Sequence, residues 1–494
     1  MINKNKYLYK GYLPTIGIEC HVQLKTKTKL FSGIDNDARD AKPNTLVSHI
    51  CFGLPGSLPV LNEEALVLGS KAGFALNSRP QRNSHFDRKH YFYPDLPKGY
   101  QITQFEAPIV LGGSVKIVVN DEDLVIGITR AHLEEDAGKS THDVGKDYSL
   151  VDLNRAGTPL LEIVSEPDIH SSAEAKAYAR ELHLLMQYAD VSEANLYYGN
   201  MRFDVNVSVS KDDKLGTRSE TKNLNSFKSV EKTVDYEIKR QVDLLEKGQA
   251  IVQETRGFDD SKQRTFSQRT KEDAHDYRYF PEPDIPPIVL SDEFIDSIKL
   301  SMPIMPDAWR ASLSTAKLDS AQIELLLESE IENPSVSYLS VINQFLDKPE
   351  ELKKIANWII NIEIPLRKEK PSLTLYDDSV RSKQYIEVFK LLNSGDLSSN
   401  GTQELITYLL TSEEEIIDVS VFANKKGLTQ NSNKDELGDI VSKILADNPK
   451  AVDDIKSGED KVIGFLVGQV MKASKGSANP GLAQKIIRDQ INSL

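Results

Sequence analysis

Cysteine is scarce in this sequence, and long apolar runs are missing from it. Only Cys20 and Cys51 occur in 494 residues, so a disulfide framework is excluded as the basis of the fold. No run approaches the roughly 18 apolar residues that cross a membrane, and the first residues lack the apolar stretch of a signal peptide. We therefore expect a cytoplasmic protein without a membrane-spanning segment.

The common glycine-rich nucleotide motifs are also absent. Residues 138–141 read Gly-Lys-Ser-Thr, like the end of a P-loop, but Leu133 stands where the motif requires its first glycine. No Gly-x-Gly-x-x-Gly occurs. The two cysteines have no partners at zinc-ligand spacing, and Cys20 falls on the apolar side of an alternating run. The sequence thus argues against a P-loop or Rossmann site, and both cysteines are expected to be buried structural residues.

The charge is acidic overall but unevenly distributed. The net charge is −14, which by itself argues against a nucleic-acid partner. The last 34 residues nevertheless carry five cationic residues and one acidic residue, namely Lys461, Lys472, Lys475, Lys485, Arg488 and Asp489. A local basic end is compatible with global acidity, so net charge does not decide the question of a partner.

The pattern of apolar residues changes near residue 290. Up to that point, β-branched alternating segments at residues 124–129 and 149–153 are interspersed with helical periods at residues 63–76, 173–188 and 229–246. This mixture predicts an α+β fold with a mainly antiparallel sheet. A proline-rich stretch at residues 280–287 closes the region, because proline should continue neither helix nor sheet there. After it, segments between residues 291 and 410 carry apolar residues at helical spacings of three and four, and a junction at residues 413–433 leads to a last small helical region.

Two alternating runs predict strands that each have one apolar and one polar face. They are residues 16–24 and residues 202–209. The polar positions are Glu19, His21 and Gln23 in the first run and Arg202, Asp204, Asn206 and Ser208 in the second. If both strands belong to one sheet, their polar faces line a common site.

Carboxylates near these runs are candidate ligands for a hard cation. Proteins hold Mg²⁺ through one or two carboxylates together with substrate phosphates and water. The candidates are Glu19, Glu134, Asp204 and Glu220, with His21 as a further ligand or as an orienting group. For any one acid taken alone, a solvated surface charge is the simpler interpretation. Glu19 and Asp204 each stand between apolar residues that are expected to be buried. A surface position therefore explains these two acids less well.

Cations and aromatic residues are densely mixed in residues 85–101 and again in residues 276–280. Lysine and arginine meet phosphates and aromatic rings stack on bases, so these segments suit a nucleotide or an RNA end. The alternative is a strand that packs its aromatic side chains into a core and is followed by a Pro-Asp turn. Both interpretations fit the residues.

Taken with longer motifs, these segments closely resemble the B subunit of the tRNA-dependent aspartyl/glutamyl-tRNA amidotransferases, the GatB/GatE family. The resemblance runs essentially from end to end. Its motifs lie at residues 16–24, 86–104, 129–141, 151–160, 162–168, 222–226, 253–256, 276–284 and 464–476.

The resemblance implies three parts and a particular reaction. The parts are a cradle-like catalytic domain similar to glutamine synthetase at residues 1–290, a helical domain at 291–410, and a small YqeY-like tail that binds tRNA at 411–494. The implied enzyme is an ATP- and Mg²⁺-dependent carbon–nitrogen ligase. It phosphorylates the side-chain carboxylate of Glu or Asp mischarged on tRNA(Gln) or tRNA(Asn), and ammonia displaces the phosphate. Ammonia would come from glutamine hydrolysed by an amidase partner, the A subunit, and the small C subunit would complete a heterotrimer.

Carried over residue by residue, the resemblance also implies a site. The expected catalytic and metal-binding residues are Glu19, His21, Glu134 and Glu220. The nucleotide is expected near Lys89, Tyr93, Lys98 and Arg202. In the tail, Lys472 and Lys475 are expected to contact the RNA backbone, and the alternative is that they only solvate a helix end.

Two departures from the family pattern stand out. Many members carry two cysteine pairs for structural zinc, but here the corresponding residues 31–34 and 48–51 retain only Cys51, so no zinc is expected. Tyr198-Gly199 replaces the usual Glu-Gly before the Arg-x-Asp strand, and nothing in the sequence explains this change.

Two other functions remain as alternatives. A glutamine-synthetase-like ligase for a free small acid would not need the helical and tail regions. A tRNA-binding scaffold with an inactive site would not need to retain Glu19, His21, Glu134 and Glu220. The sequence does not distinguish Asp-tRNA from Glu-tRNA as substrate, because companion synthetases decide which mischarged tRNA exists.

Overall fold

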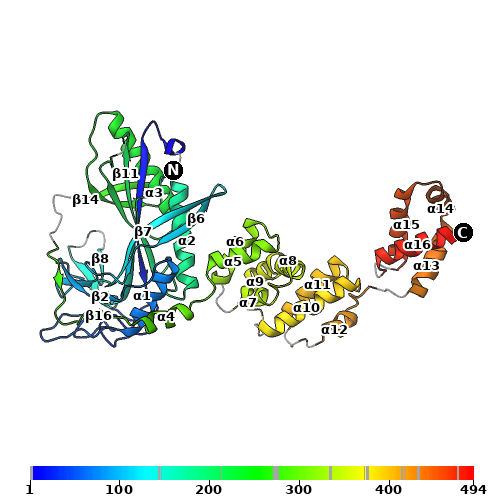
Figure 1. The fold of residues 1–494 in the computed structure, drawn as a ribbon, viewed down its shortest axis with the longest axis horizontal. Helices are drawn as coiled ribbons and strands as arrows, with labels where there is room; N and C mark the ends of the chain where they lie inside the picture. Colours follow the sequence, from blue (N-terminus) through cyan, green and yellow to red (C-terminus); the bar gives the residue numbers. More distant parts are fainter. Residues whose placement is uncertain are drawn as a thin grey trace. The chain divides into compact units, whose positions relative to one another are not determined.

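The computed structural model contains two compact units, residues Met1–Pro306 and Asp307–Leu494. Figure 1 shows the sheet-containing first unit and the all-helical second unit. The structure describes residues 4–142, 145, 147–212, 214–270, 277–332, 336–371, 373, 378–412, 416, 418–430, 434–474 and 478–493. The mixed α/β first unit and the helical second unit agree with the change of pattern in the sequence.

A 12-stranded sheet dominates the first unit. Its path runs in the order β14-β13-β12-β11-β1-β10-β7-β4-β3-β15, and β5 and β6 also pair with β7. All of these pairings are antiparallel except the parallel one between β12 and β13. The strands are β1 (Leu13–Gln23), β3 (Asp87–His90), β4 (Tyr100–Thr103), β5 (Val110–Leu111), β6 (Ser114–Val119), β7 (Glu122–Glu135), β10 (Pro159–Ser165), β11 (Met201–Ser210), β12 (Ser219–Leu224), β13 (Glu254–Asp259), β14 (Arg264–Thr270) and β15 (Phe280–Pro281). Two small sheets pair β16 (Ile288–Val289) with β2 (Asn83–Ser84) and β8 (Lys139–His142) with β9 (Ser149–Asp152).

The two alternating runs are neighbouring strands, as the sequence predicts. β1 pairs with β11 over ten residue positions, and Glu19 lies opposite Asp204 while His21 lies opposite Arg202. Every second residue of β1 is fully buried, and the residues between them are partly exposed. Cys20 lies on the buried side, and Cys51 is buried as well, as expected for structural cysteines. The polar faces of both strands therefore point to the same side of the sheet.

Helices cover the apolar face of this sheet, and their positions follow the predicted periods. They are α1 (Glu63–Ala75), α2 (Ser172–Tyr188) and α3 (Phe227–Glu246). Ser171 and Ser226 cap the last two helices by accepting the amides of Glu174 and Ser229. Val230, Val234, Ile238 and Val242 form the buried stripe of α3 at four-residue spacing. One continuous core joins these helices to β1, β10 and β11 and leaves the opposite face of the sheet to polar residues.

The proline-rich stretch corrects one prediction. Residues 280–287 were expected to end both helix and sheet, but Phe280–Pro281 pairs with β3 as the outermost strand of the large sheet. Proline is tolerated there because an edge strand needs no donor toward solvent. The first unit also continues beyond this stretch through β16 and helix α4 (Asp292–Leu300) to Pro306.

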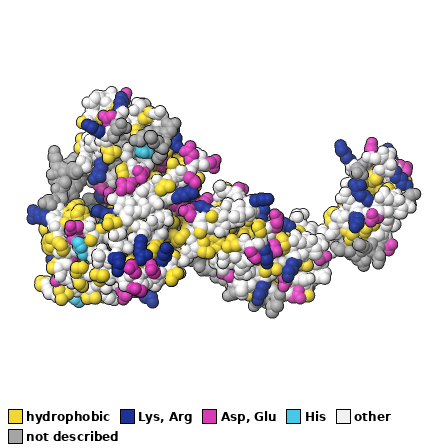
Figure 2. Space-filling view, in the orientation of Figure 1, with side chains coloured by type: hydrophobic (Ala, Val, Ile, Leu, Met, Phe, Trp, Pro, Cys, Tyr) yellow, Lys and Arg dark blue, Asp and Glu magenta, His cyan; other side chains and the backbone are white. Residues whose placement is uncertain are grey.

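The second unit is helical, as predicted. Its helices are α5 (Pro306–Thr315), α6 (Ser320–Glu332), α7 (Tyr338–Asn343), α8 (Pro349–Trp358), the π-helix η3 (Ile359–Glu363), α9 (Ile364–Glu369), α10 (Asp378–Ser394), α11 (Ser399–Thr411), α12 (Val419–Lys425), α13 (Lys434–Asp447), α14 (Pro449–Lys456), α15 (Ile463–Ala473) and α16 (Pro480–Ser493). The last four share an apolar core of their own that includes Leu437, Val441, Leu466 and Ile487. Within the described residues no helix is long and apolar enough to span a membrane. On the face shown in Figure 2, acidic and basic side chains are interspersed over both units.

Candidate functional site

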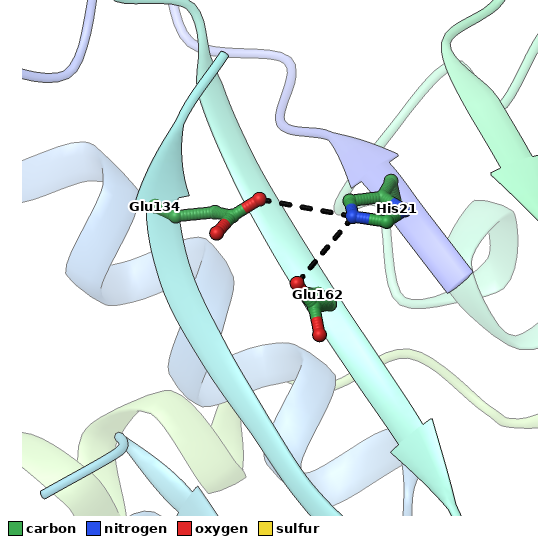
Figure 3. A group of neighbouring side chains, drawn as sticks. All are labelled: His21, Glu134 and Glu162. Atoms are coloured by element: carbon green, nitrogen blue, oxygen red, sulfur yellow. Dashed lines mark ion pairs between the residues drawn. The ribbon is translucent and has the colours of Figure 1, made fainter. Parts of the chain in front are cut away.

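Sheet register brings His21, Glu134 and Glu162 together on the polar face. His21 of β1 lies opposite Glu162 of β10, and β10 in turn places Leu160 opposite Glu134 of β7. Because alternate residues of neighbouring strands share a face, the three side chains converge, as Figure 3 shows. His21 Nε2 lies 3.4 Å from Glu162 Oε2 and 3.8 Å from Glu134 Oε1. We call these three residues the His21 group.

The His21 group is buried and electrostatically coupled. The side chains of Glu134 and Glu162 are 4% and 12% exposed. Burial favours the neutral form of His21, but Glu162 outweighs it and raises the pKa of His21 to about 9. Burial likewise opposes charge on Glu162, yet His132 and His21 hold the pKa of this carboxyl well below its usual value. His132 Nε2 lies 3.7 Å from both glutamates. Burial and Glu162 oppose charge on Glu134, but His132 and Lys89 hold the pKa of this carboxyl below its usual value.

A second set of three carboxylates, the Glu19 group, lies on the same polar face. It consists of Glu19 of β1, Asp204 of β11 and Glu220 of β12. One oxygen of each is within 4.8 Å of the others. Burial raises the pKa of Glu19, and the neighbouring charge of Glu162 raises it further. Asn206 Nδ2 donates to Glu19 Oε1 at 3.1 Å and fixes its side chain.

Cationic side chains border the two groups. Burial opposes charge on Lys89, but Glu134 raises the pKa of its ammonium above the ordinary value. Arg202 donates to Asp136 Oδ2 at 3.1 Å, and this carboxylate is also 3.3 Å from Arg155. Lys98 forms a buried ion pair with Glu135. The expected residues Lys89, Lys98 and Arg202 therefore each face or pair with an acid at the end of β7 or directly after it.

The aromatic side chains of residues 85–101 are partly buried in the core and partly exposed. Phe86 is buried at 1% exposure in the core, whereas Phe92 and Tyr93 beyond β3 are 81% and 46% exposed. A turn follows at Pro94 and Asp95, as predicted. Of residues 276–280, Tyr277–Phe280 are described and Asp276 is not.

Aromatic rings and a lysine meet where the two segments come together. Lys89 Nζ lies 5.1 Å from the ring centroid of Tyr277, and Tyr277 packs edge to face with Tyr91 at 6.2 Å. Tyr279 stacks on Phe105 with ring centroids 3.8 Å apart. Rings and a cation are thus assembled next to the His21 group, as a base-and-phosphate ligand would require.

The four predicted metal ligands are divided between the two groups. His21 and Glu134 belong to one, and Glu19 and Glu220 belong to the other. Glu162 completes the first group, and sequence reasoning did not select it although it lies within the family motif at residues 162–168. Asp204 completes the second, although the resemblance ranks it below the other acids. In the tail, Lys472 is exposed at the end of α15, and Lys475 lies outside the described residues.

The donor sets of both groups fit hard divalent cations. Each offers three side-chain atoms close enough to surround one ion, with carboxylate oxygens predominating. A third cluster, of His85, Asp87 and Glu106, has its own structural explanation. Asp87 Oδ2 accepts the amides of Phe105 and Glu106 at 3.0 Å each and closes the turn after β4, and Glu106 is 76% exposed.

Fold and site together define an α+β protein whose mainly antiparallel sheet presents two candidate cation sites with lysine, arginine and aromatic residues beside them. A family model for the GatB/GatE catalytic domain matches residues 14–296, and a GatB domain model matches residues 340–491. The chain belongs to the GatB/GatE family.

Curated relatives match the chain over nearly its whole length. The B subunit of the aspartyl/glutamyl-tRNA(Asn/Gln) amidotransferase of Persephonella marina is 43% identical over 479 residues, 96% of this chain and 98% of that protein. The protein of the same name from Coxiella burnetii is 43% identical over 97% of this chain and 99% of its own length. That from Thermoanaerobacter sp. is 41% identical over 97% and 99%.

Proposed function

We propose that this chain activates the side-chain carboxylate of Glu or Asp carried on tRNA(Gln) or tRNA(Asn), so that it is amidated to Gln-tRNA or Asn-tRNA. The names of the relatives, which cover almost the whole chain, support tRNA-dependent amidation. We further propose that activation is phosphorylation by ATP with Mg²⁺. The observation that supports this step is that two clusters of donor atoms, the His21 group and the Glu19 group, lie side by side on one sheet face.

The proposed chemistry explains the kind of residues present. A carboxylate is a poor electrophile, and an acyl phosphate gives it a leaving group. Bound Mg²⁺ would supply positive charge that stabilises the transferring phosphoryl group. The two groups would hold the ions, while Lys89 and Arg202 would orient anionic oxygens nearby. Asp136 fixes the Arg202 guanidinium, and Tyr93 and Lys98 lie in the segment proposed to bind the nucleotide. The step needs no nucleophilic side chain of the protein.

The assembly is proposed on the same basis. The relatives are named as one subunit of an amidotransferase, which supports a multi-subunit enzyme. In the proposed heterotrimer an amidase partner hydrolyses glutamine for ammonia, and a small third subunit joins the two. We propose a glutamine-synthetase-like cradle at residues 1–290, a helical domain at 291–410 and a tRNA-binding tail at 411–494. Lys472 and Lys475 are the proposed tail contacts to the RNA backbone.

The test is reconstitution with the amidase partner and the small third subunit, followed by assays of Glu-tRNA(Gln), Asp-tRNA(Asn) and free glutamate. We expect amidation of at least one mischarged tRNA that requires ATP, divalent cation and either glutamine or ammonium. Without an ammonia source, label from γ-³²P-ATP should pass to the aminoacyl-tRNA or appear as phosphate. Amidation of free glutamate at an equal rate would instead identify a small-acid ligase. ATP-independent binding of tRNA with no amidation would identify a scaffold.

A further inference from the structure

A lysine, Lys222, forms ion pairs with two members of the Glu19 group. Lys222 lies on β12 two residues after Glu220, at the irregularity in the pairing of β12 with β11. Its Nζ is 3.1 Å from Asp204 Oδ2 and 3.0 Å from Glu220 Oε1. Within the described part of the chain, Glu134 and Glu162 form ion pairs with histidines only.

Lys222 occupies the carboxylate oxygens that a metal ion would need. Asp204 Oδ1 already accepts the Asn223 amide at 2.8 Å, and Glu220 Oε2 accepts the Thr255 hydroxyl at 3.2 Å. The remaining oxygen of each carboxylate is the one that Lys222 contacts. A divalent cation bound between Asp204 and Glu220 would take these same two oxygens at about 2.0–2.6 Å. An ammonium and a divalent cation on these two oxygens would repel each other at short range, so the binding of one disfavours the binding of the other.

The surroundings of Lys222 permit it to leave. Its side chain is 39% exposed, whereas that of Asp204 is 4% exposed. A β-bulge between Phe203 and Val205 of β11 shifts the pairing beside it, and Asn223 has a positive φ of 60°. The lysine stem is flexible and its ammonium is readily solvated. Rotation of Lys222 away from the acids would leave the Asn223 and Thr255 hydrogen bonds in place.

We propose that Lys222 is a resident counter-cation that holds the Glu19 group together until a divalent cation displaces it. On displacement, its ammonium becomes available to an anionic substrate on the same face, so the anion meets Lys222 only after the cation has bound. The proposal rests on the proposed function in one respect, that the Glu19 group binds a divalent cation.

The test is Mn²⁺ titration of the full-length chain by isothermal calorimetry, without nucleotide or tRNA. Lys222→Met should tighten one Mn²⁺ site by about tenfold or more, since a competing positive charge is removed. The matched control is Lys211→Met, because Lys211 pairs with Glu246 at 3.0 Å away from the site. This control should leave Mn²⁺ affinity unchanged. Adding Glu19→Gln to Lys222→Met should abolish the gain and so assign it to the Glu19 group.

The outcomes separate this proposal from the proposed function. Unchanged or weaker Mn²⁺ binding by folded Lys222→Met, with a Glu19-dependent site present, would overturn the role of Lys222 alone. Absence of any Glu19-dependent Mn²⁺ site in both the wild type and the variant would overturn the metal role of the Glu19 group as well. Circular dichroism checks folding, and if Lys222→Met does not fold, neutral Lys222→Gln takes its place with the same expectation. Charge-preserving Lys222→Arg should show no gain.

Discussion

The His21 group and the Glu19 group are neighbours, because His21 and Glu19 lie two residues apart on β1. The negative charge of their carboxylates is nevertheless balanced by different side chains. Glu134 and Glu162 are buried and face two histidines, His21 and His132. In the Glu19 group, Asp204 and Glu220 instead share the ammonium of Lys222. His21, whose pKa is raised to about 9, must lose its proton before a ring nitrogen can bind a metal, whereas the Lys222 ammonium must move away from the acids. One group therefore exchanges a proton for the metal ion, and the other exchanges an ammonium for it.

The largest expected effect comes from removing a charge from the His21 group. Glu134→Gln keeps the shape of the side chain but removes a buried anionic ligand. Amidation by the reconstituted complex should fall by roughly 100- to 1,000-fold in kcat, the usual size of losing a preorganised charge at a phosphoryl-transfer site. The control is Glu166→Gln, an exposed glutamate that accepts from Thr129 at 2.8 Å. A tenfold or smaller loss in Glu134→Gln would remove the His21 group from the proposed mechanism.

His183 is a buried histidine whose pKa no carboxylate raises, in contrast to His21. Burial lowers the pKa of His183, which packs against Phe227, from 6.5 to about 4. Between these values the unfolded chain binds a proton that the folded chain does not, so stability falls as pH drops from about 6.5 to 4. The loss should approach about 3 kcal/mol at most. Urea unfolding of the wild type and His183→Gln from pH 7 to pH 4 measures it. The variant should lose less stability over this range, and parallel curves would contradict the assignment.

Within the Glu19 group, the more buried acid should matter more for stability. Asp204→Asn loses a charge that accepts both the Asn223 amide and Lys222, and we expect about 1–3 kcal/mol of destabilisation. Glu220→Gln removes a charge from a side chain that is 26% exposed, and should cost less than about 1 kcal/mol. Equilibrium urea unfolding at pH 7 compares the two. Equal losses would show that burial does not distinguish the members of this group.

The smallest effect is expected far from the sheet in sequence, at the exposed end of α15. Lys472→Glu should weaken tRNA binding severalfold and lower the dependence of log affinity on log salt by about one. Lys450→Glu on α14 is the matched control within the same set of tail helices. Filter binding at several salt concentrations measures both slopes. Identical slopes in the two variants would mean that Lys472 only solvates its helix end.

The periodicity of a strand predicts which of its residues share a polar face. It does not predict which residues of other strands lie beside them. β1 and β11 alternate because one side of each is buried, so Glu19, His21 and Asp204 could be placed on one face from the sequence. Glu162 escaped this reasoning because apolar residues flank it on both sides in Pro159–Ser165, and only register places it beside His21. A lone acid within such an apolar strand was the available signal.

Two further features depended on local irregularities. Lys222 reaches Asp204 next to a β-bulge, where pairing shifts by one residue and alternation no longer predicts position. Phe280–Pro281 can pair at the sheet edge because β3 bonds to β4 on one side only and leaves its other side open for a further strand. Proline content alone does not reveal this. The family resemblance predicted a function and a set of metal ligands that neither composition nor periodicity contains.

That the polar face holds two separate cation sites is tested most directly by the stoichiometry of Mn²⁺ binding. Electron paramagnetic resonance of the full-length chain at fixed Mn²⁺ should count two bound ions per chain. Glu134→Gln and Glu19→Gln should each remove a different one, and the double variant should remove both. A single bound ion that either substitution abolishes would contradict two sites and would merge the His21 and Glu19 groups into one.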